Sequence, residues 1–237
     1  MKVLVIPDVH LKPFMFRQAA ALMHQGIARR AVCLMDIPDD WDKYLDITLY
    51  EETYNEAIRF AKKYPDTAWC YGNHDLSYVW HELETGYSSA AAYTVQKKLL
   101  DLKVTLPDNN PIKYVHRIDN VLFSHGGLLN DFVEAYVPET KYTDDDSVIE
   151  HINNLGKAAM WNDDSPIWLR PQNTRMRMYK PRKFLQVVGH TPMNQITKER
   201  NIISCDVFST YSDGRPIGTH EFLLLDTITW EYLEITI

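Results

Sequence analysis

The chain has 237 residues, with 25 Lys and Arg against 32 Asp and Glu, so its formal net charge is −7 when histidine is neutral. This acidic balance argues against a stable complex with nucleic acid, because phosphate contacts require a basic surface. Hydrophobic residues make up 45% and charged residues 24% of the sequence, which is typical of globular proteins and excludes extended disorder, collagen-like repeats and coiled coil. A chain of this length buries about 70% of its surface on folding, and we expect one domain over residues 1–237.

The first half of the sequence alternates predicted strands with predicted helices. The expected strands are residues 2–6, 31–35 and 67–71, and the expected helices are residues 14–30, 44–64 and 90–102. In residues 44–64, apolar side chains recur at spacings of three and four, which is typical of an amphipathic helix. The alternation implies right-handed crossovers and a largely parallel sheet.

The second half shows a different pattern. Predicted strands at 112–118 and 121–124 flank Asp119-Asn120, a two-residue turn signal of the hairpin type. Residues 221–237 also predict two paired strands, which turn at Asp226-Thr227. We therefore expect more antiparallel pairing here, in a mixed sheet or in a second sheet packed on the first.

The sequence shows no export signal and no membrane span. The first apolar run, residues 1–6, is too short for the core of a signal peptide. The cysteines, Cys33, Cys70 and Cys205, form no CxxC pair and are expected to be buried thiols in a reducing compartment. We expect a cytoplasmic protein that has no membrane contact.

A further strand is expected at residues 185–189, and five of the predicted strands end in side chains that bind metal ions. These side chains are Asp8 and His10, Asp36, Asn73, His125 and His190. In open α/β sheets, ligands gather beyond the carboxyl ends of the strands. For any one of these residues a turn or cap role is the better interpretation, but five strands that all end in this way favour one shared site.

The types of donor indicate which ions the site binds. Carboxylate, amide and imidazole groups without thiolates suit a divalent ion such as manganese, iron or zinc. Two carboxylates, three imidazoles and an amide are more donors than one ion usually takes, so we expect two ions. Paired metal ions clamp a phosphoryl group and supply a hydroxide at neutral pH. The sequence therefore predicts phosphoester hydrolysis.

The same residues lie in five short sequence blocks with a family resemblance. The blocks are Asp8-Val9-His10, Asp36-Ile37-Pro38-Asp39, Gly72-Asn73-His74-Asp75, Ser124-His125-Gly126-Gly127-Leu128 and Gly189-His190-Thr191-Pro192. In order and spacing they resemble the calcineurin-like metallophosphoesterases, and most closely the branch of Ser/Thr protein phosphatases and diadenosine tetraphosphate hydrolases. The resemblance implies a four-layer αββα sandwich, in which two mixed β-sheets are flanked by helices.

The resemblance also implies how two metal ions are held, with Mn²⁺ expected and iron or zinc as alternatives. Asp8 and His10 would hold the first ion, and Asp36 would bridge both. The remaining ligands of the second ion would be Asn73, His125 and His190. Asn73 would also contact the substrate. A hydroxide between the ions would attack phosphorus in line with the leaving oxygen.

The resemblance gives roles to two further residues. His74 would be the general acid that protonates the leaving group, and Asp39 would orient it. Asp75 is an alternative orienting group, although a helix N-cap explains it equally well.

The sequence departs from this branch at the positions that bind phosphate. Asp40 and Trp41 stand where the branch has Arg-Gly, and Tyr71 replaces the arginine before Gly-Asn-His. A planar guanidinium binds phosphate through two parallel hydrogen bonds, which other side chains do not reproduce. Arg170, two residues after a tryptophan, resembles a phosphate-binding arginine of some relatives, with a surface position as the alternative. The basic residues after it, expected on the surface, are Arg175, Arg177, Lys180 and Arg182.

The expected substrate is a phosphoprotein, a small phosphate ester or a nucleotide. Two enzyme functions and one non-catalytic function remain open. The first is a phosphomonoesterase that resembles the Ser/Thr protein phosphatases. The second is a nucleotide phosphodiesterase or pyrophosphohydrolase, for which exposed aromatic residues would stack on a base. The candidates for stacking, for which packing in the core or at the rim is the better explanation, are Trp41, Tyr78, Trp80 and Trp168. A non-catalytic scaffold is the remote alternative, because such a protein would be expected to lose metal donors.

Overall fold

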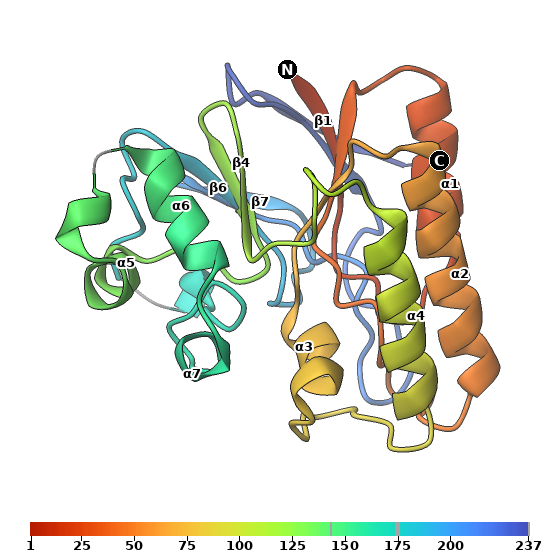
Figure 1. The fold of residues 1–237 in the computed structure, drawn as a ribbon. Helices are drawn as coiled ribbons and strands as arrows, with labels where there is room; N and C mark the ends of the chain where they lie inside the picture. Colours follow the sequence, from red (N-terminus) through yellow and green to blue (C-terminus); the bar gives the residue numbers. More distant parts are fainter. Residues whose placement is uncertain (143, 174–175, 237) are drawn as a thin grey trace.

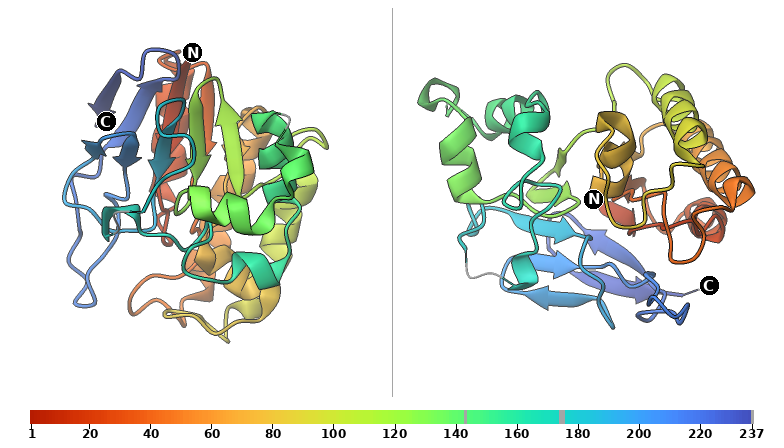
Figure 2. Two further views of the ribbon diagram at one scale, coloured as in Figure 1. Left: turned by 90° about the vertical axis from the view of Figure 1, so that its left-hand side faces the viewer. Right: turned by 90° about the horizontal axis from the view of Figure 1, so that it is seen from below.

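The computed structural model describes residues 1–142, 144–173 and 176–236. Two mixed five-stranded sheets lie between two groups of helices (Figure 1). One group is α1 (Phe14–His24), α2 (Ile47–Lys63) and α4 (Ala92–Thr105), and the other is α5 (Asn130–Tyr136), α6 (Asp145–Asn153) and α7 (Lys157–Met160). The two groups also stand apart in the view from below (Figure 2, right). The predicted αββα sandwich is confirmed.

The first sheet has the strand order β10-β9-β1-β2-β3. Its strands are β1 (Lys2–Ile6), β2 (Arg30–Cys33), β3 (Ala68–Trp69), β9 (Phe222–Asp226) and β10 (Tyr232–Ile235). β1, β2 and β3 pair in parallel, whereas β9 and β10 form an antiparallel hairpin beside β1. Both the parallel sheet and the C-terminal hairpin are as predicted.

The second sheet has the strand order β4-β5-β6-β8-β7. Its strands are β4 (Val115–Ile118), β5 (Val121–Ser124), β6 (Leu185–Val188), β7 (Thr197–Glu199) and β8 (Ile202–Ser204). β4 and β5 form the predicted antiparallel hairpin, and β5, β6 and β8 are parallel. The carboxyl ends of these three strands therefore lie at one edge of the sheet.

A hydrophobic core joins the two sheets. Val5 and Leu223 of the first sheet belong to the same buried cluster as Phe123 and Val187 of the second. β1 is buried along four of its five residues, as expected for a strand that is covered on both faces. The strand ends of both sheets are thus held at fixed positions relative to each other.

Some predicted boundaries were wrong. The first helix ends at His24 rather than at residue 30, because Gly26 adopts φ +74° and Arg30 of β2 already pairs with Val3 of β1. The short helix α3 (Asn73–Trp80) and the helices α5, α6 and α7 were not predicted. The three cysteines are buried thiols, as expected. Among the described residues, no helix is both long enough and apolar enough to cross a membrane.

Candidate metal centre and active site

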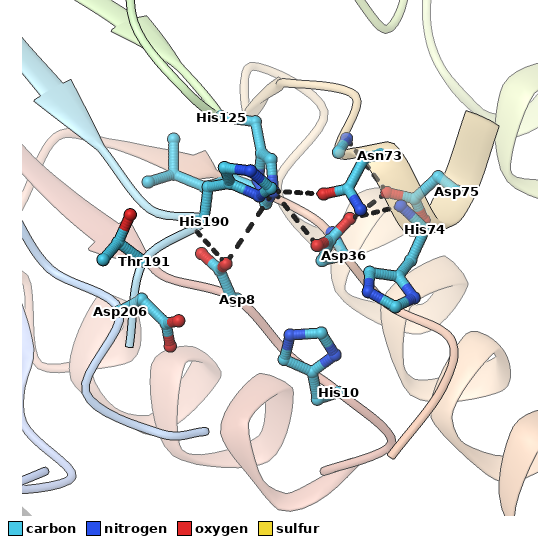
Figure 3. A network of polar contacts seen from close by, with 12 residues as sticks. Asp8, His10, Asp36, Asn73, His74, Asp75, His125, His190, Thr191 and Asp206 are labelled. Atoms are coloured by element: carbon cyan, nitrogen blue, oxygen red, sulfur yellow. Dashed lines mark hydrogen bonds and ion pairs between the residues drawn. The ribbon is translucent and has the colours of Figure 1, made fainter. Parts of the chain in front are cut away.

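The structure brings all six predicted metal ligands together at the carboxyl ends of the strands (Figure 3). Two ligands follow β1, one follows β2, one begins α3 directly after β3, and one each follows β5 and β6. Except for the partly exposed His10, each side chain is buried, with at most 5% of its residue exposed. The residues are Asp8, His10, Asp36, Asn73, His125 and His190.

Four donor groups converge at His125. Its ring nitrogen Nε2 lies 3.0 Å from Asp36 Oδ2, 3.1 Å from Asn73 Oδ1 and 3.2 Å from His190 Nδ1. A ring nitrogen carries at most one hydrogen, so it can donate to only one of these three atoms. The opposite nitrogen, Nδ1, lies 3.0 Å from the carbonyl oxygen of Leu34, which favours a proton there and leaves Nε2 as the nitrogen that can bind a metal ion. A cation among the four groups would satisfy all of them.

A second group of donors adjoins the first and shares Asp36. Ligand atoms of Asp8, His10 and Asp36 lie within 4.8 Å of one another. The Oδ1 atom of Asp8 is buried and accepts no hydrogen bond in the described part of the chain. His10 Nδ1 lies 2.9 Å from the carbonyl oxygen of Asp39, which leaves Nε2 for a ligand. The donor set therefore fits two divalent ions that share Asp36.

Two glycines make room for the carboxylates. A Cβ atom on Gly72 would lie 1.9 Å from Asp36 Oδ1, and a Cβ atom on Gly189 would lie 1.9 Å from Asp8 Oδ1. Each glycine directly precedes a ligand, so the peptide that carries one ligand closes over the carboxylate of another. The backbone N–H of His190 accordingly donates to Asp8 Oδ2 at 2.7 Å. The glycines of the Gly-Asn-His and Gly-His-Thr blocks thus have a steric role in the site.

The backbone at the site is strained. His10, Asp36 and His190 have φ values of +40°, +39° and +63°, a region that residues with a Cβ rarely adopt. The loops after β1 and β2 hold each other in this conformation, since the backbone N–H of His10 donates to the carbonyl oxygen of Asp36 at 2.8 Å. Such strain is common at functional sites, where the surrounding structure stabilises it.

The electrostatics favour a cation. Burial lowers the pKa of His125, but Asp36 and Asp8 raise it to about 10. Burial raises the pKa of Asp8 well above its usual value, and the neighbouring Asp206 adds to this effect. Burial lowers the pKa of His190 well below its usual value, so this ring is neutral and can act as a ligand. In the metal-free site the carboxylates retain a proton on His125, which a divalent ion would replace.

His74 and Asp39 form a hydrogen-bonded pair beside the metal ligands. His74 Nδ1 lies 2.9 Å from Asp39 Oδ2, which leaves Nε2 for a substrate. The other carboxylate oxygen, Oδ1, accepts hydrogen bonds from Tyr50 at 2.9 Å and from Tyr78 at 2.5 Å. Burial lowers the pKa of His74, but Asp36 and Asp39 raise it to about 9. The ring therefore carries its proton at neutral pH, as a general acid requires.

The carboxylate of Asp75 binds backbone N–H groups and does not orient the ring of His74. Its carboxylate accepts hydrogen bonds from the backbone N–H groups of Asp36 at 2.9 Å, Ile37 at 3.3 Å and Gly72 at 3.1 Å. It therefore joins the loop after β2 to the beginning of α3. This interaction fixes the position of the shared Asp36, whereas Asp39 contacts the ring of His74.

A cavity of about 570 Å³ opens over the centre, and Arg170 lines it. The Nη1 of Arg170 donates to the carbonyl oxygen of His190 at 2.6 Å, which fixes the guanidinium beside the metal ligands. Trp41 and Trp168 also line the cavity. Tyr78 is fully buried, and Trp80 packs against Trp161, so neither offers a stacking surface there. Arg177, Lys180 and Arg182 line other hollows, and Arg175 lies outside the described residues.

The sequence analysis assigned no role in the site to Asp206 or Tyr50, and it indicated Tyr78 only as a candidate for stacking on a base. Asp206 follows β8, is 1% exposed and lines the cavity near Asp8 (Figure 3). Its carboxylate accepts a hydrogen bond from Ser209 Oγ at 2.8 Å. The one available signal is that Asp206 follows a β-rich run, as the predicted metal ligands do. The tyrosines carry no such signal, because helices α2 and α3 bring them to Asp39 from separate parts of the sequence.

Comparisons with known proteins identify the family and the fold. The family model of the calcineurin-like phosphoesterases matches residues 1–214. No curated protein matches the sequence. A cold-active protein tyrosine phosphatase structure is 16% identical, with a TM-score of 0.58 over 99% of this chain and 78% of that one. A protein tyrosine phosphatase from a psychrophilic Shewanella species gives 16% identity and a TM-score of 0.56, over 99% and 80% of the two chains. A hypothetical protein from Pyrococcus horikoshii is 14% identical, with a TM-score of 0.50 over 100% and 87%. These likenesses concern the fold.

Proposed function

The chain belongs to the calcineurin-like phosphoesterases, and from this premise we propose that it hydrolyses phosphate monoesters at a centre of two divalent metal ions. One observation carries the proposal: Asp36, Asn73 and His190 converge on one ring nitrogen of His125, and Asp36 also belongs to the adjoining donor group. We propose that residues 1–237 act as one domain, because both sheets contribute ligands to this centre.

The residues divide between the two ions as follows. Asp8 and His10 would hold one ion, His125 and His190 with Asn73 would hold the other, and Asp36 would contact both. Bound ions would supply a nucleophile derived from water and would stabilise the negative charge of the phosphoryl group. The oxygen and imidazole donors suit Mn²⁺, which we propose as the metal, and also iron and zinc.

His74 would deliver the proton that the leaving group needs. The bond between phosphorus and the leaving oxygen breaks as phosphorus gains a bond to an oxygen from water, and His74 Nε2 gives its proton to the leaving oxygen. Nδ1 meanwhile keeps its hydrogen bond to Asp39, and Tyr50 and Tyr78 hold the carboxylate in place. Asn73 and Arg170 would bind oxygen atoms of the phosphoryl group.

A nucleotide pyrophosphohydrolase or phosphodiesterase is the second candidate. Its support is that Trp41 and Trp168 line the cavity, where an aromatic ring can stack on a base. Against it stands the charge of the cavity. The lysine and arginine side chains along its lining are limited to Arg170 among the described residues, whereas a polyphosphate would carry several negative charges past the metal ions.

A comparison of two chromogenic esters tests the proposal. We expect the protein with Mn²⁺ to hydrolyse p-nitrophenyl phosphate faster than bis(p-nitrophenyl) phosphate. The Asp36→Asn protein, purified in the same way, is the control for contaminating phosphatase. Preference for the diester would favour the second candidate. Activity on neither ester, with added Mn²⁺, Fe²⁺ or Zn²⁺, would contradict both and support the scaffold alternative.

A further inference from the structure

The two ends of the cavity differ in charge. Arg170 lines the cavity on the His190 side, where its guanidinium donates a hydrogen bond to the backbone carbonyl oxygen of His190. His74 lies on the side of the centre away from His190 (Figure 3). Residues 40–42 and 44 together with residues 84–87 line the cavity along with His74. We refer to these residues as the acid-side wall.

The acid-side wall is built around the general acid. A Cβ atom on Gly86 would lie 3.7 Å from His74 Cε1 and 3.3 Å from the Cβ atom of Asp39, so this backbone is packed against the pair. The ring of Tyr87 stacks on Tyr78 with 4.4 Å between the ring centroids. The backbone N–H of the next residue, Ser88, donates to the Tyr78 hydroxyl at 2.8 Å. The wall is therefore anchored to the same tyrosine that holds Asp39.

Two of the three carboxylates of the wall form no ion pair with a lysine or arginine of the described residues. Asp40 forms an ion pair with Lys12 at 2.9 Å. Asp42 and Glu84 have no such partner within 4.0 Å in the described part of the chain. Both residues line the cavity, and the charge of Glu84 acts on His74. A ligand that enters from this side therefore meets two unpaired carboxylates.

Exposed aromatic rings stand beside these carboxylates. Trp41 is 46% exposed and Tyr44 is 55% exposed, and both line the cavity with the partly exposed Tyr87. Ring faces and carboxylates together attract an organic cation, because the ring quadrupole and the negative charge act in the same direction. The other end of the cavity, with Arg170, suits the phosphoryl group.

The proposed reaction fixes how a substrate lies between these two ends. His74 must reach the leaving oxygen, so the alcohol part of the ester lies along the acid-side wall while the phosphoryl group lies on the metal ions. We propose that the preferred substrates are phosphate monoesters whose alcohol part carries a positive charge, bound by Asp42, Glu84 and the aromatic rings of this wall. This inference rests on the proposed phosphomonoesterase function. The same wall disfavours a leaving group that is itself a polyphosphate.

Matched pairs of esters test the inference in the Mn²⁺-loaded protein. Phosphocholine is compared with 3,3-dimethylbutyl phosphate, which has the same shape without the charge. A phosphothreonine peptide flanked by lysines is compared with one flanked by glutamines. We expect kcat/KM to be about tenfold higher for the charged member, since two to three exposed contacts of this kind act together. Preference in one pair alone identifies a small ammonium ester or a basic peptide as the source of the cation.

Charge-removing variants locate the effect. In Asp42→Asn/Glu84→Gln, the ratio of charged to neutral ester should fall to about two or less. Asp108→Asn/Glu139→Gln is the control, because it removes the same charge from exposed positions that do not line the cavity. It should keep the ratio of the parent protein. Raising the salt concentration from 0.02 to 0.5 M, which shortens the screening length to roughly 4 Å, should also lower the ratio in the parent protein.

The outcomes separate this inference from the function on which it rests. Equal kcat/KM values for both members of both pairs, or a preference that survives in Asp42→Asn/Glu84→Gln, would overturn the inference while hydrolysis of p-nitrophenyl phosphate upholds the proposed function. No hydrolysis of any ester, p-nitrophenyl phosphate included, would overturn the proposed function and the inference with it.

Discussion

The floor and the rim of the cavity are built differently. On the floor, Asp8, Asp36 and His125 are buried, held by strained backbone and placed by strands of both sheets. On the rim, Trp41 and Asp42 are exposed and belong to a loop. The floor retains every metal donor of the family blocks, whereas the sequence departs from them at Asp40 and Trp41 of the rim. We therefore propose that the floor determines the reaction and the rim determines the substrate.

The largest expected loss of activity comes from substitution of Asp36, the ligand that the two proposed metal ions share. Asp36→Asn should lower hydrolysis by about a thousandfold or more, roughly 4 kcal/mol in the barrier, because one carboxylate contacts both proposed ions. The number of metal ions bound per chain, measured by mass spectrometry, should fall in parallel. Near-normal turnover in this variant would contradict a centre of two ions.

Removal of the proposed general acid should lower activity nearly as much, but only for substrates whose leaving group needs a proton. His74→Ala should lower kcat for phenyl phosphate by roughly 10²- to 10⁴-fold, since general acid catalysis contributes that much. The loss should be small for p-nitrophenyl phosphate, whose leaving group needs no proton. Equal losses for the two substrates would exclude the proposed role of His74, and bound metal serves as the control for an intact floor.

Crowding of the floor should weaken metal binding. In Gly189→Ala, the added Cβ would lie 1.9 Å from Asp8 Oδ1, so the carboxylate must move. We expect Mn²⁺ affinity, measured by calorimetry, to fall about tenfold or more. Gly156→Ala is the matched control, because no atom lies within 4 Å of the added Cβ atom. Similar affinities in the two variants would show that the close approach at Gly189 does not matter.

A smaller effect is expected in the titration of His74. Its pKa is raised to about 9 in the metal-free protein, in part by Asp39. Asp39→Asn removes a negative charge, so the pKa should fall, and the ring should lose its proton at lower pH. NMR titration of the ring nitrogens measures this change directly. Because the raised pKa stabilises the fold below about pH 6.5 and this stabilisation disappears as pH rises to about 9, Asp39→Asn should lower the melting temperature more at pH 6 than at pH 10. An unchanged pKa would contradict the coupling of Asp39 to His74.

The smallest effect is expected at the rim. Arg170→Ala should raise KM for p-nitrophenyl phosphate about three- to tenfold with little change in kcat, because the guanidinium is exposed to solvent. Arg182→Ala, which lies outside the cavity lining, is the control. An unchanged KM would show that Arg170 is a surface residue that does not bind the substrate.

The sequence predicted the floor of the site far better than its surroundings. The donors that converge at the centre all follow short apolar runs, so a local pattern located each of them. The sequence did not distinguish Asp39 from Asp75 as the partner of His74, because both lie within a few residues of ligands. Their separation depends on tertiary contacts: Asp75 turns toward the backbone of Asp36, and Asp39 faces the ring.

Other parts of the structure had no local signal. Tyr50 and Tyr78 reach Asp39 from two separate helices, α2 and α3, and only the tertiary fold brings their hydroxyl groups to the same carboxylate. The first helix was predicted too long because the Ala, Leu and Met content of residues 14–30 indicates a helix, whereas the positive φ of Gly26 and the pairing of Arg30 end it earlier. The net charge of the acid-side wall depends on which carboxylates form ion pairs, and the sequence does not show this. Lys12 pairs with Asp40, whereas Asp42 has no ion-pair partner among the described residues.

The most direct test of the account is a metal titration of the active protein. Metal-free protein is titrated with Mn²⁺ while bound ions per chain and the rate of p-nitrophenyl phosphate hydrolysis are measured together. We predict two bound ions per chain, with the rate rising as the second site fills. Full activity at one ion per chain, or activity that persists without divalent metal, would contradict the proposal that two ions share Asp36.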